Sequence, residues 1–199
     1  MQAASRKPYE STHFRLQQLA DGVYAAIAVS GGAALCNAGI IDLGDCTLVF
    51  DSFLTQRAAM DLRTATEHLT GRHAEYLVNS HYHNDHIRGN QVFPDAKIVA
   101  TTKTRMLIAT RGQEEITWDS ENAPKELQTL EAGQDAAMQY DFTTWRGYYR
   151  GIIESLPTLE LKLPNLTFDT NMLFHGSHRT AEVATCGGGG HTESDAILY

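Results

Sequence analysis

The residues best suited to chemistry in this sequence lie in one short run, HYHNDH, at positions 81–86. It holds three imidazoles and a carboxylate, the donor types that borderline metals such as zinc prefer. In an extended segment His81 and His83 point to the same side, so both can reach one ion. Asp85 and His86 are adjacent and diverge unless the chain turns between them. They therefore suit the other side of the same site, or a second ion.

A further histidine, His191, follows four consecutive glycines at positions 187–190 and precedes Thr192. Glycines let the backbone turn tightly and approach a site closely. Together with the upstream run, this position predicts that His191 is the third ligand of the first ion.

Three neutral imidazoles and one water form the donor set of a catalytic zinc ion. An open fourth position lets zinc lower the pKa of a bound water to about 7, so the expected nucleophile is metal-bound hydroxide. Asp85 is the predicted catalytic residue, because its carboxylate could orient that water and later carry the proton to the leaving group. Such a mechanism needs no serine or cysteine nucleophile.

Other polar and aromatic residues give weaker indications. Asp51 ends a predicted strand, where it could orient a ligand imidazole from behind or could cap the next helix. The segment from Trp145 to Arg150 could line a substrate pocket, but aromatic residues at helical spacing favour packing. The remaining histidines have no partner at ligand spacing and are expected to be structural or exposed: His13, His68, His73, His175 and His178.

The elements before the histidine run read as a β-meander followed by a helix. Alternating apolar residues predict strands over 22–29, 34–41 and 46–50. Thr55 is a candidate N-cap for a helix that ends at Gly71. A short apolar strand over 74–80 leads into the histidine run, and another covers 97–100.

The second half of the chain begins with a helical block over 102–156, with an expected break at 122–124. Strands are predicted over 158–163, 171–175, 181–186 and 196–199, with a loop over 187–195. The order of elements predicts a single α/β domain over 1–199, in which 102–156 is a helical insertion between two groups of strands.

Composition narrows the possible partners. The chain is 42% hydrophobic, and its net charge of -8, from 24 acidic against 16 basic residues, argues against nucleic acid. No apolar stretch is long enough to be a signal peptide or a membrane span, so we expect a cytoplasmic protein with a small-molecule substrate. The cysteines are odd in number, Cys36, Cys46 and Cys186, and are expected to be free thiols.

The order of these features resembles the metallo-β-lactamase superfamily. The run HYHNDH matches the family's H-x-H-x-D-H motif, and GGGGHT at 187–192 matches its later Gly-His-Thr element. The resemblance covers about residue 20 to Tyr199. It implies an αββα sandwich with the metal site at one edge, His81, His83 and His191 on the first ion, and Asp85 and His86 on the second.

The resemblance also implies that the fold is incomplete at its C-terminal end. Similar proteins continue with a strand and a bridging Asp or Cys, then a further strand, a helix and a last His, whereas this sequence stops at Tyr199. We therefore expect weak binding of the second ion. We also expect either a fragment of a longer protein or a homo-oligomer that covers the apolar surface left by the missing part.

Three functions are compatible with these residues. The first is a zinc-dependent hydrolase, with one or two ions, acting on an ester, thioester, lactone or β-lactam. The second is a mononuclear-iron oxidoreductase that resembles persulfide dioxygenases and uses the same three histidines. The third is a non-catalytic metal-binding or assembly module.

Overall fold

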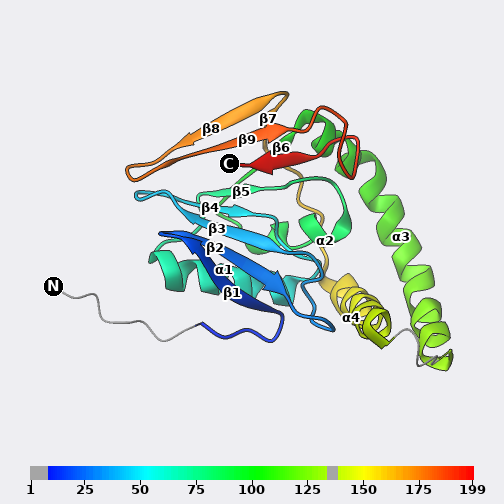
Figure 1. Ribbon diagram of the computed structural model, residues 1–199. Coiled ribbons are helices and arrows are strands. Elements are labelled where there is room, and N and C mark those ends of the chain that lie inside the picture. The colour runs from blue at the N-terminus through cyan, green and yellow to red at the C-terminus, as the bar shows by residue number, and fades with distance from the viewer. Residues whose placement is uncertain (1–8, 134–138) are drawn as a thin grey trace.

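The computed structural model describes residues 9–133 and 139–199, which form two sheets and four α-helices (Figure 1). The first sheet consists, in spatial order, of β1 (Phe14–Ala20), β2 (Val23–Ala28), β3 (Ala38–Asp42), β4 (Thr47–Phe50), β5 (Tyr76–Val78), β6 (Lys97–Thr101) and β7 (Leu166–Phe168). The second consists of β10 (Ala196–Leu198), β9 (Thr180–Thr185) and β8 (Asn171–His175). The helices are α1 (Gln56–Thr70), α2 (Asn84–Ile87), α3 (Thr102–Ala132) and α4 (Gln139–Ser155), with short 3₁₀ turns η1 (Asn90–Val92) and η3 (Leu156–Thr158).

The first sheet changes direction at β4. Strands β1 to β4 form an antiparallel meander, and β4 to β7 are parallel. Parallel neighbours need a crossover, which α1 supplies between β4 and β5. The carboxyl ends of β4, β5 and β6 therefore lie at one edge of the sheet. The loop with the histidine run leaves from this edge, directly after β5.

Each face of the first sheet is buried against a different layer. On one face α1 covers a core that includes Ile40, Val49 and Leu62. On the other face the second sheet covers a core that includes Ile41 and Phe174. Successive residues of a strand point to opposite faces, which is why Ile40 and Ile41 belong to different cores.

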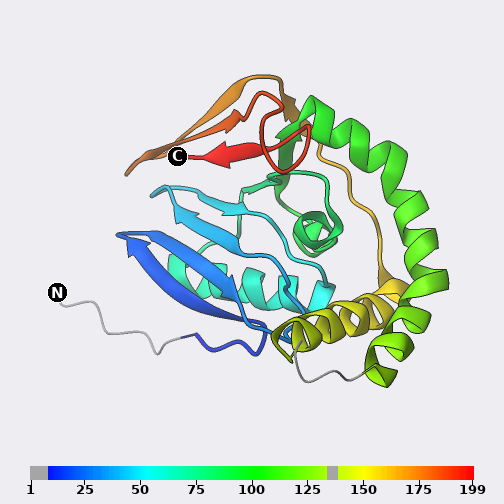
Figure 2. The same ribbon diagram turned by 45° about the vertical axis from the view of Figure 1, so that its right-hand side comes forward.

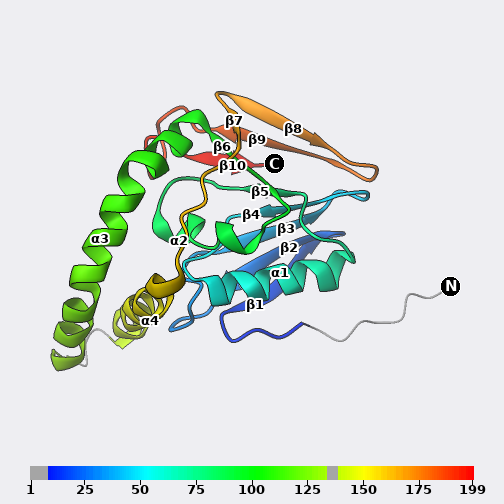
Figure 3. The ribbon, with the colours of Figure 1, turned by 180° about the vertical axis from the view of Figure 1, so that it is seen from behind.

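Three layers of the expected sandwich are therefore present: the helix α1, the first sheet and the second sheet. No helix of the described residues covers the outer face of the second sheet (Figures 1 and 3). Leu173 and Ile197 are exposed there, with 49% and 44% of their surface accessible.

The helix α1 ends as its sequence predicts. The Thr55 side chain accepts a hydrogen bond from the backbone N–H of Ala58, and Gly71 adopts a left-handed conformation with φ of 74°. Asp51 is therefore not the cap of this helix.

The helical block predicted over 102–156 is seen as α3 and α4, with 134–138 outside the described residues, but the expected break at 122–124 is wrong. The helix α3 passes through Pro124, although a proline inside a helix removes one backbone hydrogen bond. Tertiary contacts hold the helix in the turn before this proline. Asp119 pairs with the buried Arg88, and Ala123 packs against Leu54 and Ile152 in a small core beside α4. The two helices form an arch beside the sheets (Figure 2).

The predicted strand at 158–163 is also wrong, since residues 159–164 have no regular secondary structure and pair with no strand. Their backbone groups bond to side chains instead: Asn90 donates to the carbonyl of Lys162, and Gln91 accepts from the N–H of Glu160. Leu161 packs onto α3 at Gly112. The alternating residues therefore reflect packing against a helix rather than strand pairing in a sheet.

The predicted strand over 34–41 begins later, at Ala38, and residues 34–37 form a loop. The strand β1 had no prediction because only Phe14 is buried in it, so the segment shows no alternation of apolar and polar residues. No described helix has the length and apolar character needed to cross a membrane.

Candidate metal centre

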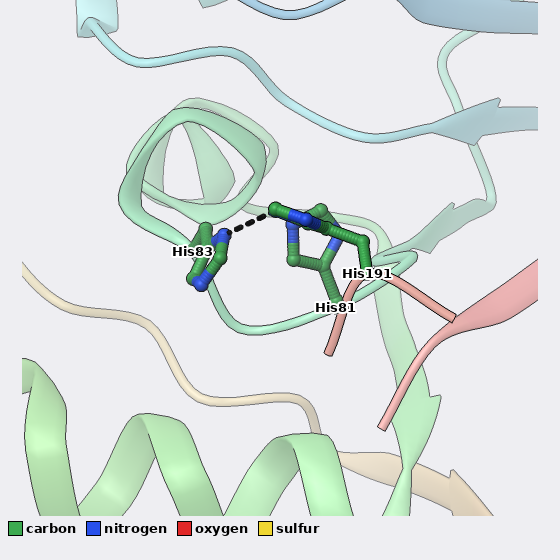
Figure 4. A group of neighbouring side chains, drawn as sticks. All are labelled: His81, His83 and His191. Carbon is green, nitrogen blue, oxygen red and sulfur yellow. Dashed lines mark hydrogen bonds between the residues drawn. The ribbon is translucent and has the colours of Figure 1, made fainter. Parts of the chain in front are cut away.

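The loop after β5 and the loop between β9 and β10 bring three histidines together (Figure 4). One ring nitrogen from each of His81, His83 and His191 lies within 4.8 Å of the others. The Nδ1 atom of His83 is 3.1 Å from Nε2 of His191. Two imidazole nitrogens bound to one tetrahedral zinc at about 2.0–2.1 Å are about 3.4 Å apart, so this spacing suits a shared ion.

The hydrogen bonding of the most buried of these three histidines, His81, shows whether a metal ion fits here. His81 is only 6% exposed, and its Nε2 atom is buried with no hydrogen-bond partner among the described residues. Leaving such an atom unsatisfied costs about 1–3 kcal/mol. A metal ion between the three rings would give this nitrogen its missing partner, so the residues fit the ion.

Burial also sets the protonation state of this ring. Desolvation, and next the neighbouring His86, lower the pKa of His81 to about 4. The ring is therefore neutral near pH 7. Its Nδ1 atom lies 2.9 Å from the Ser80 hydroxyl, which in turn donates to Asp51 at 2.8 Å. A proton on Nδ1 shared with Ser80 leaves the lone pair on Nε2, as a metal ligand requires.

The remaining two predicted ligands belong to a second cluster beside the first. Asp85 and His86 lie at the start of α2, and their donor atoms group with the thiol of Cys36, again within 4.8 Å of one another. The Nε2 atom of His86 is 3.4 Å from the Asp85 carboxylate. Adjacent residues thus converge because the chain turns into a helix there.

Asp51 holds the imidazole ring of His86 through its Nδ1 atom. Its Oδ2 atom is 2.8 Å from Nδ1 of His86, and its Oδ1 accepts a hydrogen bond from the N–H of Ser80. Burial disfavours the charged form of His86, but the Asp51 charge and hydrogen bond outweigh it and raise the pKa of His86. This contact favours the orienting interpretation of Asp51 over the capping one, since a carboxylate behind an imidazole directs the opposite nitrogen outward.

Cys36 is the member of this cluster that the sequence did not reveal. Its thiol is buried and donates to the backbone carbonyl of Asp85 at 2.8 Å. Burial raises its pKa well above the usual value. The preceding residue, Leu35, has φ of 68°, a conformation that costs a residue with a Cβ about 1–3 kcal/mol. Only the fold brings this loop beside α2.

The loop that carries His191 is held by Asp195. The Asp195 carboxylate accepts hydrogen bonds from the backbone N–H and the hydroxyl of Thr192, at 2.9 and 2.5 Å. The N–H of Ala196 then donates to the carbonyl of Ser80, which joins β10 to the histidine run. The short Thr-x-x-Asp spacing was a readable signal for this anchor.

A pocket of about 380 Å³ opens beside the two clusters. Its walls come from the loop before β3, from the start of α2 and from the helices α3 and α4: Leu35, His83, Asn84, Asp85, Glu115, Trp118, Asp119, Trp145 and Tyr148. The Tyr148 hydroxyl accepts a hydrogen bond from the Asn84 amide at 2.9 Å. Trp145 and Tyr148 thus line a pocket rather than serving only for packing.

The structure therefore brings all five predicted ligands to one edge of the sheet, in two adjacent groups. Their roles as ligands, and the role of Asp85 in proton transfer, stay predictions. The other five histidines belong to neither group. Among them His13 is buried, and its Nδ1 accepts a hydrogen bond from Ala33.

Comparison with solved structures shows the same fold. Metallo-beta-lactamases from Pontibacter korlensis and Hirschia baltica match with TM-scores of 0.60 and 0.58, at 15% and 13% identity, over 94% of this chain and 66% of theirs. The metallo-beta-lactamase FIM-1 from Pseudomonas aeruginosa, in its mono-zinc form, matches with a TM-score of 0.59 at 10% identity, over 96% of this chain and 66% of its own. The chain thus spans about two thirds of the length of these proteins.

A comparison with curated proteins found no match. The family model of the metallo-beta-lactamase superfamily matches residues 31–192, which include both histidine clusters and most of the chain. On this match and the shared fold, the chain belongs to the metallo-beta-lactamase superfamily.

Proposed function

We propose that this chain carries the metal centre of a zinc-dependent hydrolase that acts on an ester, thioester, lactone or β-lactam. The observation that carries the proposal is the convergence of His81, His83 and His191 around the unpartnered Nε2 atom of His81. When bound there, zinc would lower the pKa of a coordinated water to about 7 and polarise a carbonyl oxygen.

The protein residues supply positioning and proton transfer. His81 is held by Ser80, and His191 by the loop anchored at Asp195, so the ligand geometry is set before a metal arrives. Asp85 lies beside His86 and on the wall of the pocket. It is placed to accept a proton from a water in the site and to return it to the leaving group.

The second cluster favours the hydrolase over the mononuclear-iron alternative. Cys36, Asp85 and His86 offer a thiol, a carboxylate and an imidazole, a donor set that suits a second zinc ion. A mononuclear site would leave these groups without a role. FIM-1 was crystallised in a mono-zinc form, which supports zinc as the metal.

Turnover tests the proposal directly. The protein, purified and supplied with zinc, is assayed on a p-nitrophenyl ester, a thioester, a lactone and a chromogenic β-lactam. We expect hydrolysis of at least one, and loss of at least 100-fold in kcat/KM in His83→Ala. His178→Ala is the matched control, since His178 is exposed and far from the site in the fold. Equal rates in the wild type and His83→Ala, or no turnover on any substrate, would reject the hydrolase.

A further inference from the structure

The pocket beside the metal centre has two exposed tryptophans on its wall. Trp118 on α3 and Trp145 on α4 are 52% and 48% exposed, and they are the only tryptophans in the sequence. Large apolar side chains that face solvent around a pocket mark a place where a ligand covers them. Tyr148 completes this aromatic wall, with its ring 5.5 Å from that of Trp145 and perpendicular to it.

Carboxylates supply all the charged groups that line the pocket: Asp85, Glu115 and Asp119. Asp119 is neutralised by its ion pair with the buried Arg88. Asp85 belongs to the second ligand cluster. Glu115 is half-buried, and no ion pair within 4.0 Å is found for it in the described part of the chain. Arg88 and Arg111 act on it electrostatically, but Arg88 pairs with Asp119 and Arg111 pairs with Glu193. Glu115 is thus the acidic group left to meet a ligand.

The basic residues of α4 do not balance this charge. Arg146 and Arg150 both pair with Glu131 near the end of α3, at 3.0 and 2.8 Å, and neither lines the pocket. Helical spacing explains the separation, because positions 146 and 150 lie on one face of α4 and positions 145 and 148 on another. Apart from the candidate metal ligands, the pocket wall therefore keeps one unpaired negative charge, at Glu115.

The combination of aromatic rings and a carboxylate without an ion pair has a specific chemical preference. Aromatic faces attract organic cations, and recognition of quaternary ammonium groups relies on such walls. A trimethylammonium group donates no hydrogen bond, so it needs aromatic surface and negative charge rather than a matched acceptor. An anionic group would meet repulsion from Glu115 in the same place.

We infer that this pocket holds the cationic end of the substrate, and that the substrate is an ester or related acyl compound with a quaternary ammonium group. The inference rests on the proposed function for its scissile bond and on the pocket for its cation. His83 and Asp85 lie on the wall of the same pocket, so a bound cation would leave the acyl group facing the metal ligands.

Binding is tested with ligands that have no scissile bond. The two tryptophans make intrinsic fluorescence a direct reporter of occupancy. Choline is titrated against 3,3-dimethylbutan-1-ol, its neutral isostere. We expect a saturable change with choline and a Kd at least tenfold lower than for the alcohol, which corresponds to about 1.4 kcal/mol.

Matched variants test which residue selects the cation. Glu115→Gln should remove most of the tenfold preference for choline. Glu114→Gln, an exposed neighbour on the same helix, should keep it. Equal affinity for choline and the alcohol, binding of neither, or an unchanged preference in Glu115→Gln would overturn the inference, and the first of these would identify the pocket as a site for neutral apolar groups.

Hydrolysis separates this inference from the proposed function. With zinc supplied, acetylcholine should be cleaved with a kcat/KM at least tenfold above that of 3,3-dimethylbutyl acetate. Equal cleavage of both esters would refute the cationic substrate and leave the hydrolase intact. Choline binding that depends on Glu115, with neither these esters nor the substrate panel cleaved, would refute the hydrolase and leave the cation site intact.

Discussion

The protonation of His81 should control the stability of the metal-free protein between pH 4 and pH 7. Its pKa is about 4 in the folded chain, because the ring is buried, whereas the unfolded chain has the ordinary histidine pKa of 6.5. As the pH falls, the unfolded chain takes up this proton first. Stability from the neutral buried ring is therefore fully present above pH 6.5 and is lost as the pH falls toward 4.

The difference between these two pKa values corresponds to about 3 kcal/mol of unfolding free energy. Most of that loss, about 2–3 kcal/mol, should occur between pH 7.5 and pH 4.5. The variant His81→Gln retains a polar side chain that cannot titrate in this range. The free energy of unfolding of the wild type should thus fall by that much more than that of the variant over the same interval.

The assay is urea denaturation followed by circular dichroism, with a chelator present, at pH 7.5, 6.0 and 4.5. The quantity compared is the difference in unfolding free energy between wild type and variant, and how it changes with pH. Contributions from carboxylates that titrate in both proteins cancel in this difference. A gap that stays constant from pH 7.5 to 4.5 would refute the assignment of a neutral buried imidazole at position 81.

Three further outcomes follow from particular contacts. In Cys36→Ser, zinc content should fall by one ion per chain, measured by elemental mass spectrometry; unchanged content would remove Cys36 from the second cluster. In Asp119→Ala, the buried Arg88 loses its partner, so the free energy of unfolding should fall by about 3–5 kcal/mol in urea denaturation, and a loss under about 1 kcal/mol would contradict a buried pair. In Gly89→Ala, the new methyl group would collide with the backbone carbonyl of Ser52, so unfolding should become easier by about 3 kcal/mol, whereas a neutral effect would contradict that packing.

Much of the fold followed from patterns that local physics enforces. The cap at Thr55 and the left-handed Gly71 were predictable because each satisfies backbone groups within its own turn. The errors came where distant contacts decide. Pro124 stays inside a helix because Arg88, Leu54 and Ile152, which are distant in the sequence, hold Asp119 and Ala123 just before it. No local pattern contains those partners.

The candidate site divides in the same way. The histidine run indicated its own ligands, because short spacing after a strand fixes which side chains can meet. Cys36 was read as an isolated thiol, since its neighbours Asp85 and His86 are 49 and 50 residues away in the sequence. The aromatic pocket was only partly predictable, because the sequence indicated a possible lining role for the segment from Trp145 but none for Trp118. Trp118 and Trp145 lie on two helices whose pairing depends on a shared core that the sequence pattern does not specify.

The central claim is that His81, His83 and His191 hold one metal ion together. It is tested most directly by zinc binding to metal-free protein, with the bound zinc per chain measured after removal of excess metal. The wild type and His178→Ala should each retain at least one zinc ion, and His83→Ala and His191→Ala should each bind it at least tenfold more weakly. The metal centre would be contradicted if the wild type failed to bind zinc, or if both ligand variants retained as much zinc as the wild type.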